Sequence, residues 1–416
     1  MAGLKNCEAN MRKALQHRGP ISRISRRAAN GLALAVVLVP FILSQVVQAQ
    51  TYTILYSFND SSGGQAFPWG PLVEANGTLY GTTSTSEVFS VNASNGVETV
   101  LYTFKGGTDG LYPFSGVIRD LGGNLYGTTS MGGTSNRGTI FKLDSSNTET
   151  VLHSFGSGAR SPYGGLTLDA NGNLYGTTTY GGTFHDGIVF KFGKNGRYTV
   201  LYNFKGGTDG FYPFYENLIL DKTGDLYGTT VSGGGTTTCN GPCGTVFRLN
   251  IKTHLETVLY RFTGGTDGAN PYAGLIRDAN GNLYGATHNG GVSQGCGGAS
   301  CGTVFKLDKA GKETVLYSFQ GTDGAYPQGS LILDAQGNLY GTTFRGGTYG
   351  YGTVFKLNTN GVETVLHSFN GDDGEYPTSS LVQDAAGNLY GTTSEGGTAG
   401  CGGPPEGCGV IFKITP

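Results

Sequence analysis

Short apolar runs alternate with glycine-rich turns along most of the chain. Residues 331–369 show the pattern clearly, with runs at 331–334, 339–343, 353–357 and 363–369. Runs of this length, separated by Gly, Asn and Asp, predict short antiparallel strands joined by tight turns. Gly337, in the first of these turns, is free to take the positive φ that a tight hairpin requires.

The group of four runs recurs through the chain. Its core, Leu-Tyr-Gly, occurs at Tyr80, Tyr126, Tyr175, Tyr227, Tyr284, Tyr340 and Tyr390. A repeat of roughly fifty residues with four strands in each unit is typical of a β-propeller. We therefore expect an all-β fold, a seven-bladed β-propeller with four antiparallel strands in each blade. The 74 glycines follow no Gly-X-Y period, which excludes collagen.

The units adjoin without long linkers. They run over about 68–104, 113–155, 162–204, 213–262, 271–319, 327–369 and 377–416. The last unit ends after its third strand, whereas residues 51–58 match the fourth strand at 363–369 and follow no unit of their own. We expect this N-terminal strand to complete the last blade, because closure leaves no unpaired edge. Residues 50–416 then form a single propeller.

Residues 1–49 have the pattern of an export signal. A stretch with seven Lys or Arg precedes the apolar residues 32–47, and Val47-Gln-Ala49 fits a small-residue cleavage site. We expect cleavage after Ala49 and a periplasmic or extracellular location; the alternative is an uncut membrane anchor. The remaining chain carries 20 basic and 28 acidic side chains, a formal charge of −8.

That charge bears on the partners. Nucleic acid and anionic lipid both require a basic footprint, so neither is expected to bind. No later apolar run is long enough to span a bilayer, so we expect no membrane span after cleavage. We expect a monomer without a cofactor, and a polysaccharide or another envelope or extracellular protein as partner.

Six cysteines remain after the signal, in three close pairs. The pairs are Cys239–Cys243, Cys296–Cys301 and Cys401–Cys408. An even number of cysteines in an exported chain predicts disulfides. Because each loop is short, such bonds would fix local loops and add little global stability. The alternative is a zinc site built from the four cysteines of two neighbouring loops.

The repeat also resembles a known family. Gly-Asn-Leu-Tyr-Gly-Thr-Thr, then Gly-Gly-Thr, then Gly-Thr-Val-Phe-Lys-Leu and Glu-Thr-Val-Leu-Tyr-Ser-Phe are similar to the GloVer tandem repeat of exported bacterial "choice-of-anchor" proteins. The resemblance covers residues 51–416. Its layout is also similar to NHL propeller repeats. The resemblance implies export and a ring of tandem repeats, and it supplies no catalytic residues.

The loops between units contain a recurring aspartate in a Gly-Thr-Asp-Gly context. These residues are Asp109, Asp209, Asp267, Asp323 and Asp373. Calcium takes carboxylate and carbonyl oxygens, so a ring of calcium ligands is one interpretation. The other is that each Asp caps its own turn. One carboxylate per loop and the lack of a D-x-D-x-D-G loop favour the turn.

Aromatic residues crowd the same loops. The rings are Phe67, Trp69, Tyr112, Phe114, Tyr163, Tyr212, Phe214, Tyr272, Tyr326 and Tyr376. Flat rings among hydrogen-bonding groups can bind sugars, although recurring rings also pack between blades. The ligand-binding candidates are Trp69, Tyr112, Tyr163, Tyr180, Tyr212, Tyr215, Tyr326 and Tyr376.

Charged exceptions to the repeat are the candidates for catalysis, because a structural role should recur in every unit. Glu216, His288, Arg345 and Glu395 stand at variable loop positions. Together they could supply an acid and a base for polysaccharide cleavage; the alternative is a variable solvated surface. His153 and His367 replace Tyr in the fourth strand, and we expect them to be packing variants.

The sequence therefore predicts an exported binding or scaffold module, with a glycan as the candidate ligand. The first alternative is a polysaccharide lyase or glycoside hydrolase acting at the loop-rich face. The second is a purely structural envelope protein. Fold alone does not choose between them, because propellers host all three.

Overall fold

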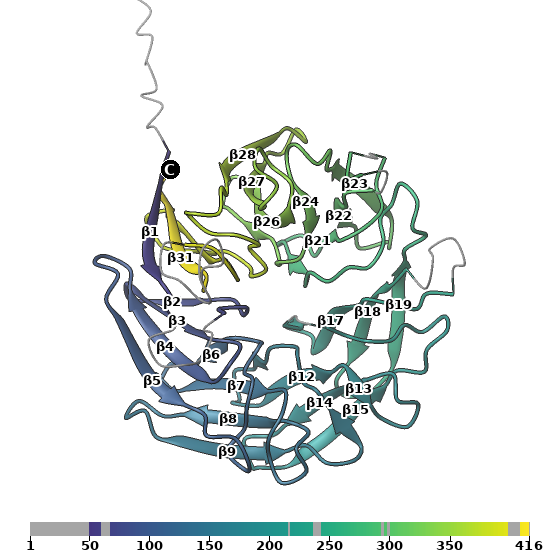
Figure 1. The fold of residues 1–416 in the computed structure, drawn as a ribbon. Coiled ribbons are helices and arrows are strands. Elements are labelled where there is room, and N and C mark those ends of the chain that lie inside the picture. The colour runs from purple at the N-terminus through teal and green to yellow at the C-terminus, as the bar shows by residue number, and fades with distance from the viewer. Residues whose placement is uncertain are drawn as a thin grey trace, which may run out of the picture. The chain divides into compact units, whose positions relative to one another are not determined.

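The computed structural model describes residues 50–59, 67–214, 217–235, 243–292, 295–297, 300–397 and 408–415. The predicted signal peptide lies outside these residues. Gln48–Pro416 form one compact unit, and it is a ring of seven antiparallel sheets (Figure 1), the arrangement that surrounds a central channel in β-propellers. The prediction of an all-β, seven-bladed propeller is confirmed. No helix in the described part of the chain is long and apolar enough to cross a membrane.

Each blade is a sheet whose first strand lies nearest the channel (Figure 1). Blade 1 comprises β2 (Val73–Ala75), β3 (Thr78–Thr82), β4 (Glu87–Asn92) and β5 (Glu98–Thr103). Blade 2 comprises β6 (Val117–Arg119), β7 (Leu125–Thr129), β8 (Thr139–Leu143) and β9 (Glu149–Ser154). Blade 3 comprises β11 (Thr167–Leu168), β12 (Leu174–Thr178), β14 (Ile188–Phe192) and β15 (Tyr198–Asn203).

Blades 4 to 7 follow the same plan. Blade 4 comprises β16 (Ile219–Leu220), β17 (Asp225–Thr230), β18 (Thr245–Asn250) and β19 (Glu256–Arg261), and blade 5 comprises β20 (Ile276–Arg277), β21 (Leu283–Thr287), β22 (Thr303–Leu307) and β23 (Glu313–Ser318). Blade 6 comprises β25 (Ile332–Leu333), β26 (Leu339–Arg345), β27 (Thr353–Leu357) and β28 (Glu363–Ser368). Blade 7 comprises β29 (Val382–Gln383), β30 (Leu389–Thr392), β31 (Val410–Thr415) and β1 (Thr51–Ser57). Two loops add short strands: β24 (Ala325–Pro327) pairs with β26, and β10 (Ala159–Arg160) pairs with β13 (Tyr180–Gly181).

The ring is closed by the two ends of the propeller. β1 pairs antiparallel with β31, from Thr51 opposite Thr415 to Ser57 opposite Val410. The N-terminal strand thus supplies the outermost strand of blade 7, as the sequence predicts. Closure removes the free edge that would otherwise be open to pairing with another chain.

A hydrogen-bonded turn joins the first two strands of most blades. In blade 6, the Asp334 carboxylate accepts hydrogen bonds from the Asn338 backbone N–H at 2.8 Å, the Asn338 amide at 2.7 Å and the Tyr340 hydroxyl at 3.0 Å. Burial acts to raise the pKa of Asp334, but the hydrogen bonds outweigh it and the pKa is lowered. Gly337 takes φ +86° in this turn. The turn motif therefore has a structural role.

The glycine of Leu-Tyr-Gly lies beneath a buried phenylalanine. A Cβ added to Gly341 would lie 2.7 Å from Phe355 Cζ and 2.8 Å from Leu331 Cδ2. Phe355 is fully buried. The motif therefore uses glycine because the core of each blade leaves no room for a side chain there.

Neighbouring blades meet through a repeated pair of phenylalanines. Phe319, just after β23, packs edge-to-face on Phe355 of β27 with ring centroids 5.1 Å apart. The equivalent pairs are Phe58–Phe89, Phe104–Phe141, Phe155–Phe190, Phe204–Phe247, Phe262–Phe305 and Phe369–Phe412. These rings hold the seven blades together around the ring.

Candidate functional site at the channel mouth

The loops between blades and the loops between second and third strands lie at the same end of the ring, because successive strands run in opposite directions. We call this end the loop face. Before the proline of several inter-blade loops the chain takes a left-handed conformation, with φ of 60° at Tyr112, 58° at Tyr212, 59° at Tyr326 and 54° at Tyr376. This turn leads the chain from the outer strand of one blade toward the channel.

The residue after the proline places a ring near the channel in five successive blades. These rings are Trp69, Phe114, Tyr163, Phe214 and Tyr272, here called the aromatic arc. Successive centroids are 6.1, 5.6, 5.2 and 6.0 Å apart. All five are half-buried, so each packs on its neighbours and still presents part of its surface to solvent.

The arc gives way to polar residues in blades 6 and 7, where Gln328 and Thr378 follow the proline. A cavity of about 20 Å³ lies at this junction, between Trp69 and Phe114 on one side and Gln328, Thr378 and Ser379 on the other. That volume holds about one water molecule.

The inner segments of blades 1 and 2 pack closely beside this cavity. A Cβ on Gly70 would lie only 2.2 Å from the Gly116 backbone nitrogen of the next blade. A sugar does not fit in a cavity of this volume, so it would have to lie across the rings.

The other tyrosine candidates lie outside the arc. Tyr212 packs edge-to-face on Tyr180 at 5.1 Å, and the Arg160 guanidinium lies 5.4 Å from the centre of the Tyr180 ring. Tyr112 stacks against Phe114 at 6.1 Å. These rings are half-buried like the arc, and Tyr112 packs against it from outside. Tyr215 lies outside the described residues.

Three members of the arc are absent from the sequence-based ligand candidates. Phe114, Phe214 and Tyr272 occupy the same position after a proline as Trp69 and Tyr163 do. Aligning the units on that proline would have found them. Tyr326 and Tyr376 precede the proline instead, and therefore lie outside the arc.

His288 continues the line of rings away from the channel. Its imidazole lies between Tyr272 at 5.0 Å and Tyr326 at 4.9 Å, and its Nδ1 is buried without a hydrogen-bond partner among the described residues. Burial lowers the pKa of His288 to about 4. The neutral imidazole is therefore the form present at neutral pH, and its position is that of a packed ring.

Arg345 and Glu395 flank a different tyrosine. The Arg345 guanidinium lies 5.1 Å from the centre of the Tyr376 ring, in a cation–π contact. Glu395 pairs through its backbone with Glu375, the residue before Tyr376. His288 packs between Tyr272 and Tyr326 instead, and Glu216 lies outside the described residues. The acid–base set therefore stays a prediction.

The loop aspartates are engaged by their own loops. Asp109 accepts hydrogen bonds from the Tyr102 hydroxyl at 2.9 Å and the Lys105 backbone N–H at 2.6 Å. Equivalent pairs of donors serve Asp209, Asp267 and Asp323. Asp373 accepts from the Asn370 N–H and faces the His367 ring. In the part of the chain that the structure describes, no three metal-binding side chains cluster, and this geometry favours the turn-capping interpretation.

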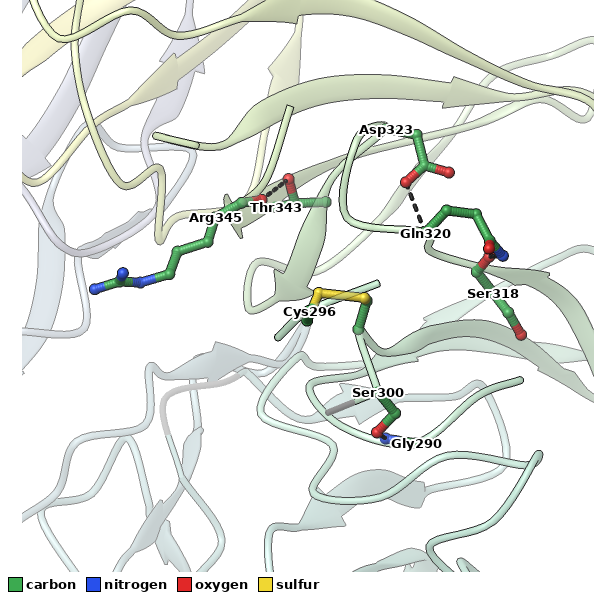
Figure 2. The surroundings of a disulfide bond; sticks show 9 residues. Gly290, Cys296, Ser300, Ser318, Gln320, Asp323, Thr343 and Arg345 are labelled. Carbon is green, nitrogen blue, oxygen red and sulfur yellow. Dashed lines mark hydrogen bonds between the residues drawn. A yellow bond between two sulfur atoms is a disulfide. The ribbon is translucent and has the colours of Figure 1, made fainter. Parts of the chain in front are cut away.

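One disulfide joins described residues, Cys296 and Cys301, with their Cα atoms 5.7 Å apart. Figure 2 shows it beside the hydrogen bond from the Gly290 N–H to the Ser300 hydroxyl, at 2.7 Å, with Arg345 pointing away. Cys243 and Cys408 are also disulfide-bonded, while Cys239 and Cys401 lie outside the described residues. The oxidised cysteines do not support the zinc alternative.

Comparisons with known proteins agree with this architecture. The extracellular domain of a putative hybrid two-component system from B. thetaiotaomicron is similar with a TM-score of 0.56 at 12% identity, over 88% of this chain and 39% of that one. This chain thus spans about two fifths of that structure. A gluconolactonase from Xanthomonas campestris is similar with a TM-score of 0.43 at 16% identity, over 88% and 89% of the two chains.

These identities are low enough that the likeness concerns the fold alone. No curated protein sequence matches the chain significantly. The model of the Gloeobacter/Verrucomicrobia repeat matches residues 41–242 and 236–416, which together span the whole ring. The chain belongs to the Gloeobacter/Verrucomicrobia repeat family.

Proposed function

We propose that the protein is an exported glycan-binding module that binds a polysaccharide across the aromatic arc. The observation that carries the proposal is the unbroken line of five half-exposed rings beside the channel, from Trp69 to Tyr272. A sugar ring has one apolar face that stacks on such surfaces and hydroxyl groups that need polar neighbours. Gln328 and Thr378 supply polar groups at the end of the arc.

The small volume of the cavity beside Trp69 supports binding along a surface rather than in a deep pocket. Because the cavity at the mouth is about 20 Å³, a chain would lie over the rings and contact several blades at once. Several weak stacking contacts in line suit a polymer better than a single small sugar. The disulfide between Cys296 and Cys301 supports export, because such bonds persist in oxidising compartments.

Affinity electrophoresis through gels that contain soluble polysaccharides, followed by an assay for new chain ends, tests the proposal. We expect retardation by at least one polysaccharide without new ends. Trp69→Ala and Tyr163→Ala should reduce it severalfold, whereas Tyr349→Ala, at an exposed ring outside the arc, should not. Circular dichroism should confirm that each variant is folded.

The remaining outcomes would overturn the proposal. New chain ends would establish the hydrolase or lyase alternative and make the charged loop residues the next variants. A lack of retardation across neutral and acidic polysaccharides would favour the structural alternative. Equal loss in Tyr349→Ala and the arc variants would place binding elsewhere.

A further inference from the structure

A second candidate site lies on the opposite end of the ring, where the turns within each blade are found. A groove of about 550 Å³ runs between blade 3 and the turn after β18 in blade 4. That volume is within the range of small-ligand sites. Basic residues line it: Lys191, Lys194, Arg197 and His254. Among the described residues that line this groove, none is acidic.

The outer turn of blade 3 lacks the acidic residues found in the matching turns of blades 2 and 5. This turn, residues 193–198, reads Gly-Lys-Asn-Gly-Arg-Tyr, whereas residues 144–149 of blade 2 read Asp-Ser-Ser-Asn-Thr-Glu and residues 308–313 of blade 5 read Asp-Lys-Ala-Gly-Lys-Glu. Lys194 and Arg197 stand at the positions of Lys309 and Lys312, but blade 3 has Gly193 and Tyr198 where blade 5 has Asp308 and Glu313. Tyr198 packs on His153, and the change leaves Lys194 and Arg197 without a carboxylate in their own turn.

The cations are positioned and available. Lys191 lies 5.6 Å over the Tyr175 ring, and the Lys194 backbone N–H donates to Asn173 Oδ1 at 3.2 Å, which fixes the turn. Lys194 and Arg197 are exposed. In the part of the chain that the structure describes, Lys191, Lys194 and Arg197 form no ion pair. The nearby Asp169 is engaged by Asn173 and Tyr175.

The corresponding groove between blades 4 and 5 also has basic lining residues, Arg248, Arg277 and Lys309, but it is smaller and has an acidic residue in its lining. Its volume is about 200 Å³, and Asp308 is part of its lining. Arg277, which also lines it, lies 3.6 Å from the Asp221 carboxylate. The groove between blades 3 and 4 is therefore the larger of the two, and none of the described residues in its lining is acidic.

We propose that this groove binds an acidic saccharide, a glycan unit that carries carboxylate or sulfate groups. Three cations supply the charge complement, and Asn195 and Thr199 present amide and hydroxyl groups to sugar hydroxyls. A nucleic acid fits less well. The ring has a net charge of −8, and no Phe, Tyr or Trp is found among the described residues of the lining to stack on bases. This site is independent of the aromatic arc.

Isothermal titration of the purified protein with trigalacturonic acid and with dextran sulfate, each at low and at physiological salt, tests the proposal. Neutral galactotriose and dextran serve as uncharged counterparts. We expect at least one acidic probe to bind, more weakly as salt rises, and the neutral ones to show no measurable heat. Binding by trigalacturonic acid alone would assign carboxylate recognition, and binding by dextran sulfate alone would assign sulfate recognition.

Variants separate this groove from the rest of the surface. Lys194→Gln/Arg197→Gln should weaken binding of the acidic probe at least tenfold, because both changed residues lie in an exposed turn and leave the core intact. Lys309→Gln/Lys312→Gln, at the matching turn of blade 5, should change it less than twofold. Tyr349→Ala, at an exposed ring outside both proposed sites, should leave it unchanged.

Three results would overturn the assignment. The first is no binding of either acidic probe. The second is an equal loss in the blade 5 control or in Tyr349→Ala. The third is equally tight, equally Lys194- and Arg197-dependent binding of single-stranded DNA, which would indicate a general polyanion surface.

Discussion

The phenol ring of Tyr52 lies parallel to the imidazole of His367, with centroids 3.7 Å apart and planes at 8°. Tyr52 belongs to β1 and His367 to β28, so the contact spans the interface between blade 6 and the closing strand of blade 7. The Tyr52 hydroxyl also donates to the Asp373 carbonyl oxygen at 2.6 Å. This stack is one of two ways in which the blades join at their outer edge.

The interface between blades 2 and 3 repeats the arrangement, with His153 stacked on Tyr198 at 4.1 Å. Other interfaces pair a tyrosine with a glutamate of the next blade at the same positions. These pairs are Tyr102–Glu149, Tyr202–Glu256, Tyr260–Glu313 and Tyr317–Glu363. In the two His–Tyr interfaces the first residue is His instead of the larger Tyr, and the second is Tyr instead of the smaller Glu. The two differences compensate in volume and keep the interface filled.

A first prediction concerns pH. Burial, reinforced by the aspartate of the preceding loop, raises the pKa of Glu149, Glu313 and Glu363 to about 7 and that of Glu256 to about 8. Between the ordinary glutamate pKa and these raised values, the folded protein therefore keeps protons on the four carboxyl groups that the unfolded chain releases. Stability from these groups is complete below about pH 4.5 and is lost as the pH rises through 7 to 8.

Other groups set the acid limit. Hydrogen bonds lower the pKa of the turn aspartates, including Asp334, so their contribution is lost in strong acid. Burial lowers the pKa of His153 and His288, which removes some stability below about pH 6.5. The four glutamates favour the folded state at low pH, and the two histidines, fewer in number, act in the opposite direction. We therefore expect the melting temperature to be higher at pH 5 than at pH 8.

Calorimetry across this range provides the test. Each glutamate is partly exposed, so its contribution is about 1 kcal/mol after allowing for solvent screening. The variant with all four glutamates changed to glutamine should lose the decline between pH 5 and pH 8. An equally steep decline in that variant would show that other groups cause it.

A second prediction is that a Tyr–Glu interface can be converted to a His–Tyr interface only when both residues are changed together. Tyr102→His should leave a gap beside Glu149, and Glu149→Tyr should crowd Tyr102; each should cost about 1–3 kcal/mol. The double variant recreates the pair found between blades 2 and 3 and should recover at least 1 kcal/mol of this loss. Chemical denaturation in a double-mutant cycle measures the coupling, and purely additive losses would contradict the prediction.

How much the sequence could predict follows from what a repeat encodes. Strand number, blade number and closure by residues 51–58 depend on local pattern and were all predictable. His153 and His367 were identifiable as packing variants, but their tyrosine partners were not, because one sequence does not reveal the register between blades. The loop aspartates left two interpretations open until the Tyr102 hydroxyl and its equivalents were seen to donate to them.

The same limit applies to the candidate site. The sequence locates aromatic loops but not which rings meet beside the channel, since that depends on how far each loop reaches inward. It therefore placed Tyr326 and Tyr376 with Trp69, whereas the structure places Phe114 and Tyr272 in that line. The basic groove lies in the turns at the opposite end of the ring, where the sequence-based prediction names no candidate residues.

A third prediction concerns the Leu-Tyr-Gly motif. Gly341→Ala would place a methyl group 2.7 Å from Phe355 Cζ in a fully buried core, so we expect a loss of about 2–3 kcal/mol. Phe355→Leu in the same chain should recover part of that loss by making room. Gly156→Ala, where no atom lies within 4 Å, is the matched control and should change stability by less than about 0.5 kcal/mol. Equal effects of Gly341→Ala and Gly156→Ala in urea denaturation would contradict the steric explanation.

The last prediction concerns closure of the ring. Tyr52→Phe removes only the hydrogen bond to the Asp373 carbonyl and should cost about 1 kcal/mol. Tyr52→Ala also removes the stack on His367 and the contact with Phe412, so we expect about 3–5 kcal/mol. Because β1 joins the ring only through β31 in its sheet, hydrogen exchange should accelerate first in β1 and β31. Uniformly faster exchange in all blades would show instead that the ring opens as one cooperative unit, with no local weakness at the closing strand.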